Sequence, residues 1–217
     1  MYFCGYISVR CKGNKKRQTH MIFERGHFDS SVVNESQIRR SLEGIRNFSA
    51  SSEYSSSPTV FLSHKHDDLK DLRGVMGMLK NLGAKIYIDS MDNKMPEQTN
   101  GVTASRIKEV IEFCDKFILL ATDKAIESYW CNWELGIGDA HKFSRHIAIL
   151  PIKEKGAYDF QYKGNEYLQI YSSIDYEDGT NRYVNSSEII PRGYYVCKPR
   201  DEKGIRYITP LKKWLNQ

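Results

Sequence analysis

The sequence has no apolar run long enough to cross a bilayer and no cysteine pattern typical of a secreted disulfide framework. Its longest apolar runs, such as 117–121, are far shorter than the stretch of about 20 residues that a membrane-spanning helix needs. The N-terminus lacks the long apolar core and small-residue cleavage site of a signal peptide. The five cysteines are an odd number and form neither a CxxC pair nor a His/Cys metal pattern. We therefore expect a soluble, cytoplasmic protein with free thiols, no metal site and no membrane partner.

Several short motifs that define large enzyme classes are also missing. No GxGxxG follows the first apolar strand pattern, and GxxxxGK[ST], HExxH and GxSxG do not occur. These absences disfavour Rossmann, P-loop, zinc-protease and α/β-hydrolase chemistry. The net charge of +5 is mild for a chain of 217 residues. A strong nucleic-acid binder usually shows a denser basic face, so no nucleic-acid partner is expected.

The first 57 residues differ in character from the rest of the chain. Apolar stretches at 2–9 and 20–23 flank a basic turn at 12–17, which predicts a small hairpin. Apolar residues at helical spacing predict an amphipathic helix at 36–48, and the Ser-rich segment 49–58 is typical of a flexible linker. We therefore predict an N-terminal extension over residues 1–57 and a main domain over residues 58–217. Two roles stay open for the extension, binding a trigger or covering a sheet edge.

After Pro58 the chain alternates between strand and helix patterns. Short runs rich in apolar residues predict strands, and amphipathic stretches between them predict helices. The strands are expected at 59–63, 85–89, 116–121 and 146–152, and the helices at 68–82, 103–114 and 128–142. This alternation predicts an α/β fold with a central parallel sheet and helices on both faces. Beyond Pro151 the patterns are weaker and predict a helix at 167–174, a last strand at 193–198 and a closing helix at 210–215.

Ligands of open parallel sheets bind outside the carboxyl ends of the strands, so the residues that follow each strand are candidates for a site. The helix at 128–142 begins near the same edge. On it Trp130 and Glu134 are four residues apart and share one face, with the indole beside the carboxylate. A carboxylate beside an aromatic wall can stabilise a developing cation, as in glycoside cleavage. Taken alone, such a pair is more often a half-buried packing residue and a surface acid.

The order of four separated segments adds more than the pair alone. They are VFLSHKHDD at 60–68, KIYID at 85–89 before a long loop, IxxxIxxCDKFILLAT at 107–122 and SxWCxxEL at 128–135. In this order and at these intervals they resemble the TIR (Toll/interleukin-1 receptor) domain family, in its bacterial and plant-like NADase branch. The resemblance covers about residues 58–152 securely and extends loosely to 217. It implies a flavodoxin-like TIR fold.

The resemblance also implies an activity and a set of site residues. In the enzymatic branch of the family, a glutamate on this helix is essential for cleaving the nicotinamide–ribose bond of NAD⁺, and Glu134 occupies that position. Trp130 matches the tryptophan of the family's WxxxE pattern. The resemblance further assigns substrate contacts to Ser63, His64, Lys65 and Asp89. A polar strand end and a loop-capping aspartate are the ordinary alternatives for these residues, and the cation that meets the pyrophosphate stays open.

The resemblance finally suggests a biological role. A nearly stand-alone TIR chain is similar to the Thoeris-type anti-phage proteins, in which NAD⁺ is a substrate and no further cofactor is implied. Such an enzyme would make a signalling nucleotide, for example a cyclic ADP-ribose isomer, that reaches a downstream effector. A TIR–TIR homo-oligomer is expected for activity. The alternatives are an NADase that depletes the NAD⁺ pool and a non-catalytic interaction module. Hydrolysis, cyclisation and base exchange stay open because pocket shape and water exclusion select the acceptor.

Overall fold

A computed structural model describes residues 7–9, 22–34, 36, 57–89, 100–155, 165–183, 186–203 and 205–217. The predicted helix at 36–48, nearly all of the Ser-rich linker and the loop after Asp89 lie outside these residues, except for Ser36 at the start of that helix. In the part of the chain that is described, no helix is both long and apolar enough to cross a membrane.

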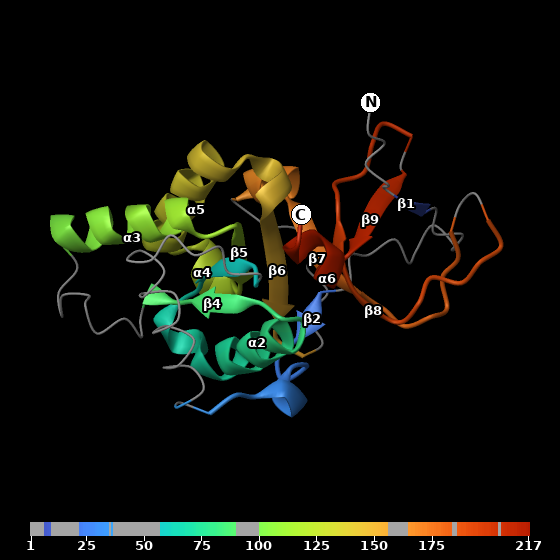
Figure 1. Cartoon of the computed structure of the whole chain (residues 1–217), viewed down its shortest axis with the longest axis horizontal. Helices are drawn as coiled ribbons and strands as arrows, with labels where there is room; N and C mark the ends of the chain where they lie inside the picture. Colours follow the sequence, from blue (N-terminus) through green and yellow to red (C-terminus); the bar gives the residue numbers. More distant parts are fainter. Residues whose placement is uncertain are drawn as a thin grey trace.

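A parallel sheet forms the centre of the molecule (Figure 1). Its strands lie side by side in the order β4 (Lys85–Tyr87), β3 (Thr59–Ser63), β5 (Lys116–Ala121), β6 (Ile147–Lys153) and β7 (Ser172–Glu177). Numbered along the chain, this order is the 2-1-3-4-5 arrangement of flavodoxin-like folds. Every residue of β3, β5 and β6 is buried, as expected for parallel strands that are covered on both faces. The predicted fold class is confirmed.

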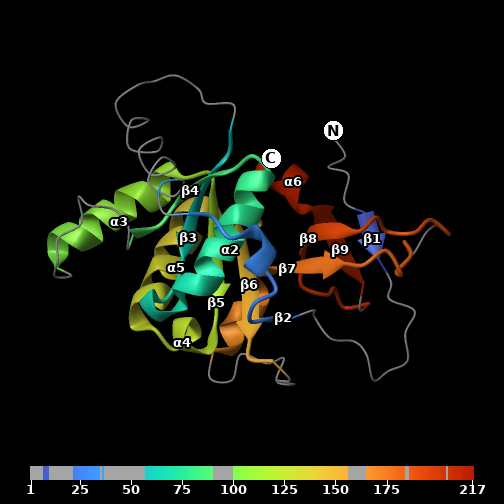
Figure 2. The ribbon, with the colours of Figure 1, turned by 90° about the horizontal axis from the view of Figure 1, so that it is seen from below.

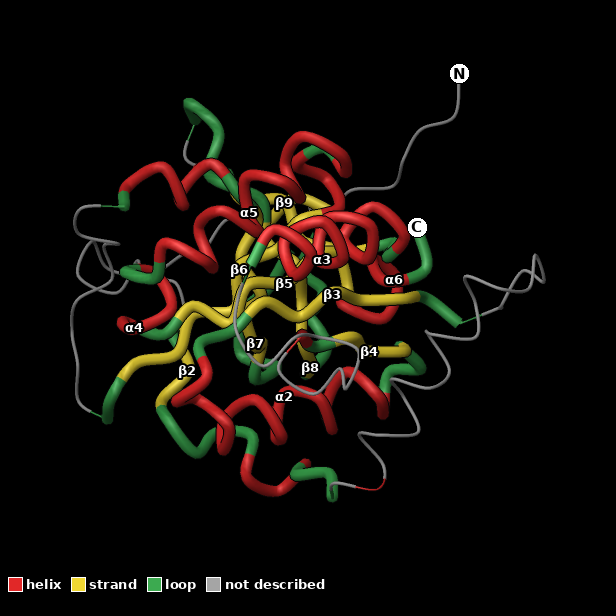
Figure 3. The backbone as a smooth tube through the Cα atoms, turned by 90° about the vertical axis from the view of Figure 1, so that its left-hand side faces the viewer, coloured by secondary structure: helices red, strands yellow, loops and turns green. Residues whose placement is uncertain are grey.

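Helices cover the two faces of this sheet. Helix α2 (Leu69–Asn81) lies on one face, and α3 (Gly101–Phe113) and α5 (Tyr129–Lys142) pack together on the other (Figures 1 and 3). Gly83 follows the end of α2 with a φ of +93°, a conformation that favours glycine. A short helix, α4 (Asp123–Ile126), leads from β5 towards α5.

The C-terminal part adds an antiparallel extension next to β7 (Figure 2). It consists of β8 (Gly193–Cys197) and β9 (Arg206–Pro210), with α6 (Leu211–Leu215) following β9. The N-terminal strand β1 (Ile7–Val9) pairs with β9 as the outer strand of the extension. The predicted strand at 193–198 and helix at 210–215 are confirmed. The predicted helix at 167–174 is wrong in its second half, because only a 3₁₀ turn, Glu166–Ile170, precedes strand β7.

The N-terminal segment is built into this architecture. Strand β2 (Phe23–Glu24) pairs in parallel with the end of β6, whereas β1 pairs with β9. The predicted hairpin lies mostly outside the described residues, and the described parts of its two arms pair with β9 and β6. An isolated two-stranded hairpin is marginal in water, whereas β2 places Phe23 at 1% exposure in the core, 5.0 Å from the ring of Phe28. The predicted domain boundary after residue 57 stays a prediction.

Candidate active site

Helix α5 brings its acidic residue to the carboxyl edge of the sheet. Ser128 caps the helix by accepting a hydrogen bond from the backbone N–H of Cys131 at 3.4 Å. The helix packs against β3, β5 and β6. Gly138 permits this close approach, because a Cβ atom there would lie 3.0 Å from the Phe117 ring. One turn earlier, Glu134 lies in the core with 1% exposure.

Glu134 meets Ser63, the last residue of β3. The Ser63 hydroxyl donates a hydrogen bond of 2.5 Å to Oε2 of Glu134, and both residues are buried. The other carboxylate oxygen, Oε1, is also buried and accepts no hydrogen bond from the described residues. An unmatched buried oxygen is costly in a folded protein and often marks a place that a ligand or water fills.

The surroundings of Glu134 disfavour its ionised form. Burial raises the pKa of Glu134 well above its ordinary value, and the nearby negative charge of Asp89 raises the pKa further. The Ser63 hydroxyl and the Trp130 indole act in the opposite direction. An ionised Glu134 at this position is poorly screened by water, so its negative charge strongly favours a nearby positive centre.

His64 and Asp89 lie beside this group. His64 Nδ1 is 3.8 Å from Asp89 Oδ1 and 3.3 Å from the backbone oxygen of Leu62. Burial lowers the pKa of His64, which keeps the imidazole neutral near pH 7 despite the nearby carboxylate. The side chain of Asp89 retains 18% exposure. The structure thus brings four of the predicted site residues together: Ser63, His64, Asp89 and Glu134.

The other two predicted residues lie at the margin of this group. Trp130 is half-buried on the same face of α5 as Glu134, and its ring centroid is 5.0 Å from that of Trp133. Lys65 is partly exposed and precedes the 3₁₀ turn His66–Asp68. Within the described residues its side chain makes no hydrogen bond or ion pair with the Glu134 group.

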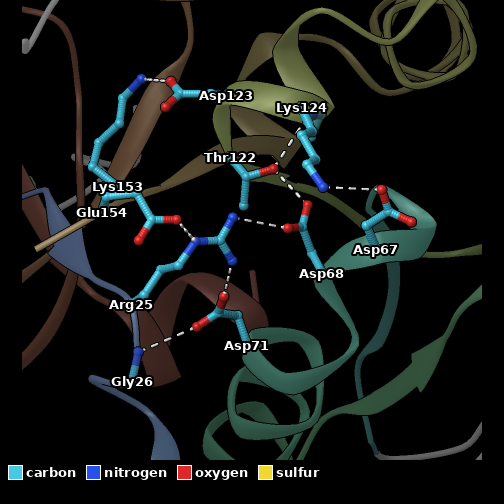
Figure 4. A network of polar contacts seen from close by, with 11 residues as sticks. Arg25, Gly26, Asp67, Asp68, Asp71, Thr122, Asp123, Lys124, Lys153 and Glu154 are labelled. Atoms are coloured by element: carbon cyan, nitrogen blue, oxygen red, sulfur yellow. Dashed lines mark hydrogen bonds and ion pairs between the residues drawn. The ribbon is translucent and has the colours of Figure 1, made fainter.

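A polar network that sequence reasoning missed lies at the same edge of the sheet (Figure 4). Arg25, which follows β2, binds Asp68 at 3.0 Å, Glu154 at 2.6 Å and also Asp71. Asp68 accepts a second hydrogen bond of 2.5 Å from Thr122, which follows β5. The network therefore ties the N-terminal segment to the loops after β3, β5 and β6.

This network explains the acidic residues that follow the first-strand motif. Asp68 is 2% exposed and anchors Arg25, whereas Asp67 is exposed and pairs with Lys124 at 3.0 Å. Lys153 pairs with Asp123 beside them (Figure 4). Only the position of Asp68 at the end of the polar run that follows a buried strand hinted at such a role. Nothing in the sequence linked it to an arginine 43 residues earlier.

The fold is an α/β domain of the flavodoxin-like class. Its buried carboxylate lies at the carboxyl edge of the sheet near β3 and β5, the two strands between which the strand order reverses. The chain belongs to the TIR domain family, because the family model described as TIR domain matches residues 60–185, more than half of the chain. It is also 31% identical over 117 residues to a protein of Bacillus cereus (strain MSX-D12) named probable 3' cyclic ADP-D-ribose synthase ThsB'. That match covers 53% of this chain and 59% of the relative, so it spans little more than half of either protein.

Proposed function

We propose that this chain cleaves NAD⁺ between nicotinamide and ribose, with Glu134 as the catalytic carboxylate. The observation that carries the proposal is the burial and hydrogen bonding of this side chain. Glu134 is buried, one oxygen is held by Ser63, and the other is left without a donor in the described structure. A ribose hydroxyl is a donor of the right kind for Oε1, and hydrogen bonds to a carboxylate are among the stronger ones in proteins.

The chemistry that the site favours is loss of a neutral leaving group. When the bond between ribose C1′ and the nicotinamide nitrogen breaks, its electron pair goes to the nitrogen and neutral nicotinamide leaves. Positive charge then develops on C1′ and the ring oxygen. The negative charge of Glu134, held in a site that excludes water, stabilises this charge more strongly than it stabilises the ground state. An acceptor hydroxyl or water then bonds to C1′ and releases its proton.

The neighbouring residues take supporting roles in this proposal. Ser63 is a positioning residue that holds Oε2 and so directs Oε1 towards the substrate. Trp130 forms an apolar wall beside the reacting ribose, and His64 and Asp89 line the substrate side. Lys65 is the candidate for the pyrophosphate, because Arg25, Lys124 and Lys153 at this rim are each engaged by a carboxylate.

We further propose that the product is a cyclic ADP-ribose isomer that acts as a signal in anti-phage defence. The name of the Bacillus cereus relative, a probable 3' cyclic ADP-D-ribose synthase, supports this class of product. In the cell the enzyme would act in the cytoplasm, and the nucleotide would reach a separate effector. We also propose that activity depends on a TIR–TIR homo-oligomer, so that nicotinamide release per molecule rises with protein concentration.

The test compares wild type, Glu134→Gln and Glu127→Gln in purified form. Each protein is incubated with NAD⁺, and nicotinamide and adenine-containing products are followed by chromatography and mass spectrometry. Glu127 is a matched control, since it is an exposed glutamate seven positions before Glu134, between α4 and α5.

Wild type and Glu127→Gln should release nicotinamide at similar rates. Release by Glu134→Gln should be at least about 100-fold slower, which is the scale of a lost transition-state contact. A product one water lighter than ADP-ribose would support cyclisation. Equal rates for wild type and Glu134→Gln would remove Glu134 from the reaction. No release by wild type across a wide range of protein concentrations would contradict the enzymatic proposal.

A further inference from the structure

Asp68 joins two segments of the chain at the carboxyl edge of the sheet (Figure 4). Its Oδ2 accepts a hydrogen bond of 2.5 Å from the hydroxyl of Thr122, the residue after β5, and its Oδ1 lies 3.0 Å from Nη2 of Arg25. Asp68 and Thr122 are both buried. A buried carboxylate is stable only with such partners, so the three side chains form one unit, which we call the Asp68 clasp.

Arg25 brings the N-terminal segment into the Asp68 clasp. Each of its three guanidinium nitrogens binds a different carboxylate: Nη2 binds Asp68, Nη1 binds Asp71 in the first turn of α2, and Nε binds Glu154 just after β6 at 2.6 Å (Figure 4). A planar guanidinium presents its donors at fixed angles, which a lysine ammonium does not. The segment after β2 is thereby held against the segments that follow β3 and β6.

On one side, Asp68 is tied to the stretch that carries Ser63 and His64. The backbone N–H of Asp68 donates to the Lys65 oxygen at 2.9 Å, which closes the turn directly after His64. Burial lowers the pKa of His64, and the charge of Asp68 is among the nearby charges that raise it. The position of Asp68 therefore affects both the path of the chain beyond Ser63 and the electrostatics at His64.

On the other side, Thr122 leads to the helix that carries Glu134. The hydroxyl that donates to Asp68 also accepts a hydrogen bond of 3.1 Å from the backbone N–H of Ala125, which caps α4. The backbone N–H of Ser128, the cap of α5, in turn donates to the Ala125 oxygen at 3.1 Å. The place of Thr122 therefore helps to set where α5 begins and where its carboxylate lies.

The two segments meet again at the candidate active site. The Ser63 hydroxyl donates to Glu134, and the Cys131 thiol donates to the backbone oxygen of His64 at 3.4 Å. These contacts and the one made by the Thr122 hydroxyl all join the same two segments. A displacement at one contact is therefore passed to the others, and a misplacement of about 1 Å is enough to slow a reaction strongly.

We propose that the Asp68 clasp positions Glu134 and Ser63 for NAD⁺ cleavage, so that the N-terminal segment around Arg25 is part of the catalytic machinery. This inference rests on the proposed function, and it adds a role for a segment outside residues 60–185, which the TIR model matches. Arg25, Asp68 and Thr122 are positioning residues, because they act through the segments that hold the carboxylate. Loss of the clasp lowers kcat more than it changes KM, because a misplaced Glu134 loses contacts made in the transition state.

The test measures kcat and KM for nicotinamide release, at a temperature well below the unfolding midpoint of each protein. Thr122→Val removes the hydroxyl and keeps the side-chain volume, whereas Thr122→Ser keeps the hydroxyl. Arg25→Met removes the cation, and the Thr122 pair tests the clasp even where Arg25→Met fails to fold. Hydrogen exchange of residues 63–68 and 122–128, followed by mass spectrometry, gives a readout that does not depend on activity.

Two controls separate positioning from a general loss of stability. Lys124→Met removes a cation at the same edge of the sheet whose partner, Asp67, is exposed. Arg206→Met breaks the buried ion pair with Asp175, which joins β9 to β7 in another part of the molecule. Both controls should keep the kcat of wild type, although urea unfolding should show that Arg206→Met is less stable.

Thr122→Val and Arg25→Met should each lower kcat by at least about 10-fold, with KM changed by less than about threefold. Hydrogen exchange should become faster in both segments, and Thr122→Ser should keep most of the wild-type kcat. An unchanged kcat in Thr122→Val and Arg25→Met, unchanged exchange in both segments, or an equal fall of kcat in Arg206→Met would overturn this proposal alone. Absence of release by wild type would overturn the proposed function, and this inference with it.

Discussion

Glu134 is 1% exposed and has a raised pKa, so folding moves an ionisable group from water into a site that disfavours its charge. The folded protein therefore binds a proton at Glu134 more tightly than the unfolded chain does. The cost of ionisation appears as pH rises through the raised pKa of the folded state and is absent below the pKa of the unfolded state. Such a cost is tolerated where function requires a charged group.

Replacing Glu134 by glutamine should stabilise the protein near neutral pH while removing activity. The neutral amide keeps an oxygen that can accept from Ser63 but carries no charge to bury. We expect the free energy of unfolding to rise by about 1 kcal/mol, which corresponds to a rise in melting temperature of about 2–4 °C. Thermal unfolding at neutral pH and at about pH 4 measures it. The gain should shrink at the lower pH, and a variant that melts below wild type at neutral pH would contradict the account.

Replacing Ser63 by alanine tests the positioning role of the hydroxyl. The change removes the hydrogen bond to Oε2, which raises the pKa of Glu134 further and leaves its carboxylate less fixed. Nicotinamide release should fall by roughly 10- to 100-fold, the range for a hydrogen bond to a charged group. Steady-state rates at saturating NAD⁺, compared with Ser128→Ala at the cap of α5, measure the effect. An unchanged rate in Ser63→Ala would show that the hydroxyl does not position Glu134.

At the scale of elements, the segment after β2 is held against α2 by polar contacts and by close packing. Arg25 reaches Asp68 and Asp71, and the backbone at 28–31 lies directly on two glycines of α2. A Cβ atom at Gly74 would lie 2.6 Å from the Phe28 oxygen, and one at Gly77 would lie 1.5 Å from the Ser31 oxygen. Both contacts are with backbone, which cannot move aside without displacing the segment.

Replacing Arg25 by methionine should destabilise the fold. The buried carboxylates of Asp68 and Asp71 would lose their cation, and an unpaired buried charge is costly. Since the side chain of Arg25 is 30% exposed, we expect the free energy of unfolding to fall by about 2 kcal/mol rather than by the full value for a buried pair. Urea unfolding measures it, with Lys70→Met as the control. Lys70 forms an exposed pair with Asp29, so its loss should matter little, and equal midpoints for both variants would count against the role of Arg25.

Replacing Gly77 by alanine tests the packing of the same segment. Alanine favours helix by about 1 kcal/mol over glycine, but here its methyl group would collide with the Ser31 carbonyl. We expect the free energy of unfolding to fall by roughly 1–3 kcal/mol in total. Gly136→Ala is the matched control, because nothing lies within 4 Å of a Cβ at that position of α5, and it should be neutral or stabilising. If Gly77→Ala were as stable as Gly136→Ala, the close approach of the segment would be disproved.

At the scale of the whole molecule, the parts that the sequence predicted are those with local signals. The apolar runs of β3, β5 and β6 and the amphipathic helices between them carry their pattern within a few residues of one another. Glu134 became a candidate through the resemblance that four separated segments carry together, one of which begins at Ser128. Its hydrogen bond with Ser63 was not predicted, although both residues were expected at the carboxyl edge of the sheet.

The parts that sequence reasoning missed depend on partners far along the chain. Strand β7 has the polar sequence SSIDYE, yet it is almost entirely buried between β6 and β8, where Asp175 binds Arg206 of β9 at 2.5 Å. Neither residue signals a strand without the other. Strands β1 and β2 likewise pair with β9 and β6 rather than with each other. No local pattern marks such long-range pairing.

The most direct test of the account is the pH dependence of kcat/KM for nicotinamide release, in wild type and Asp89→Asn. The proposed mechanism requires ionised Glu134, so the rate should rise with pH through a pKa well above that of an ordinary glutamate. Removing the charge of Asp89 should move this acid limb to lower pH, since that charge raises the pKa of Glu134. An acid limb at the ordinary carboxyl range in wild type, or one that stays in place in Asp89→Asn, would contradict the assignment of Glu134 as the buried catalytic carboxylate.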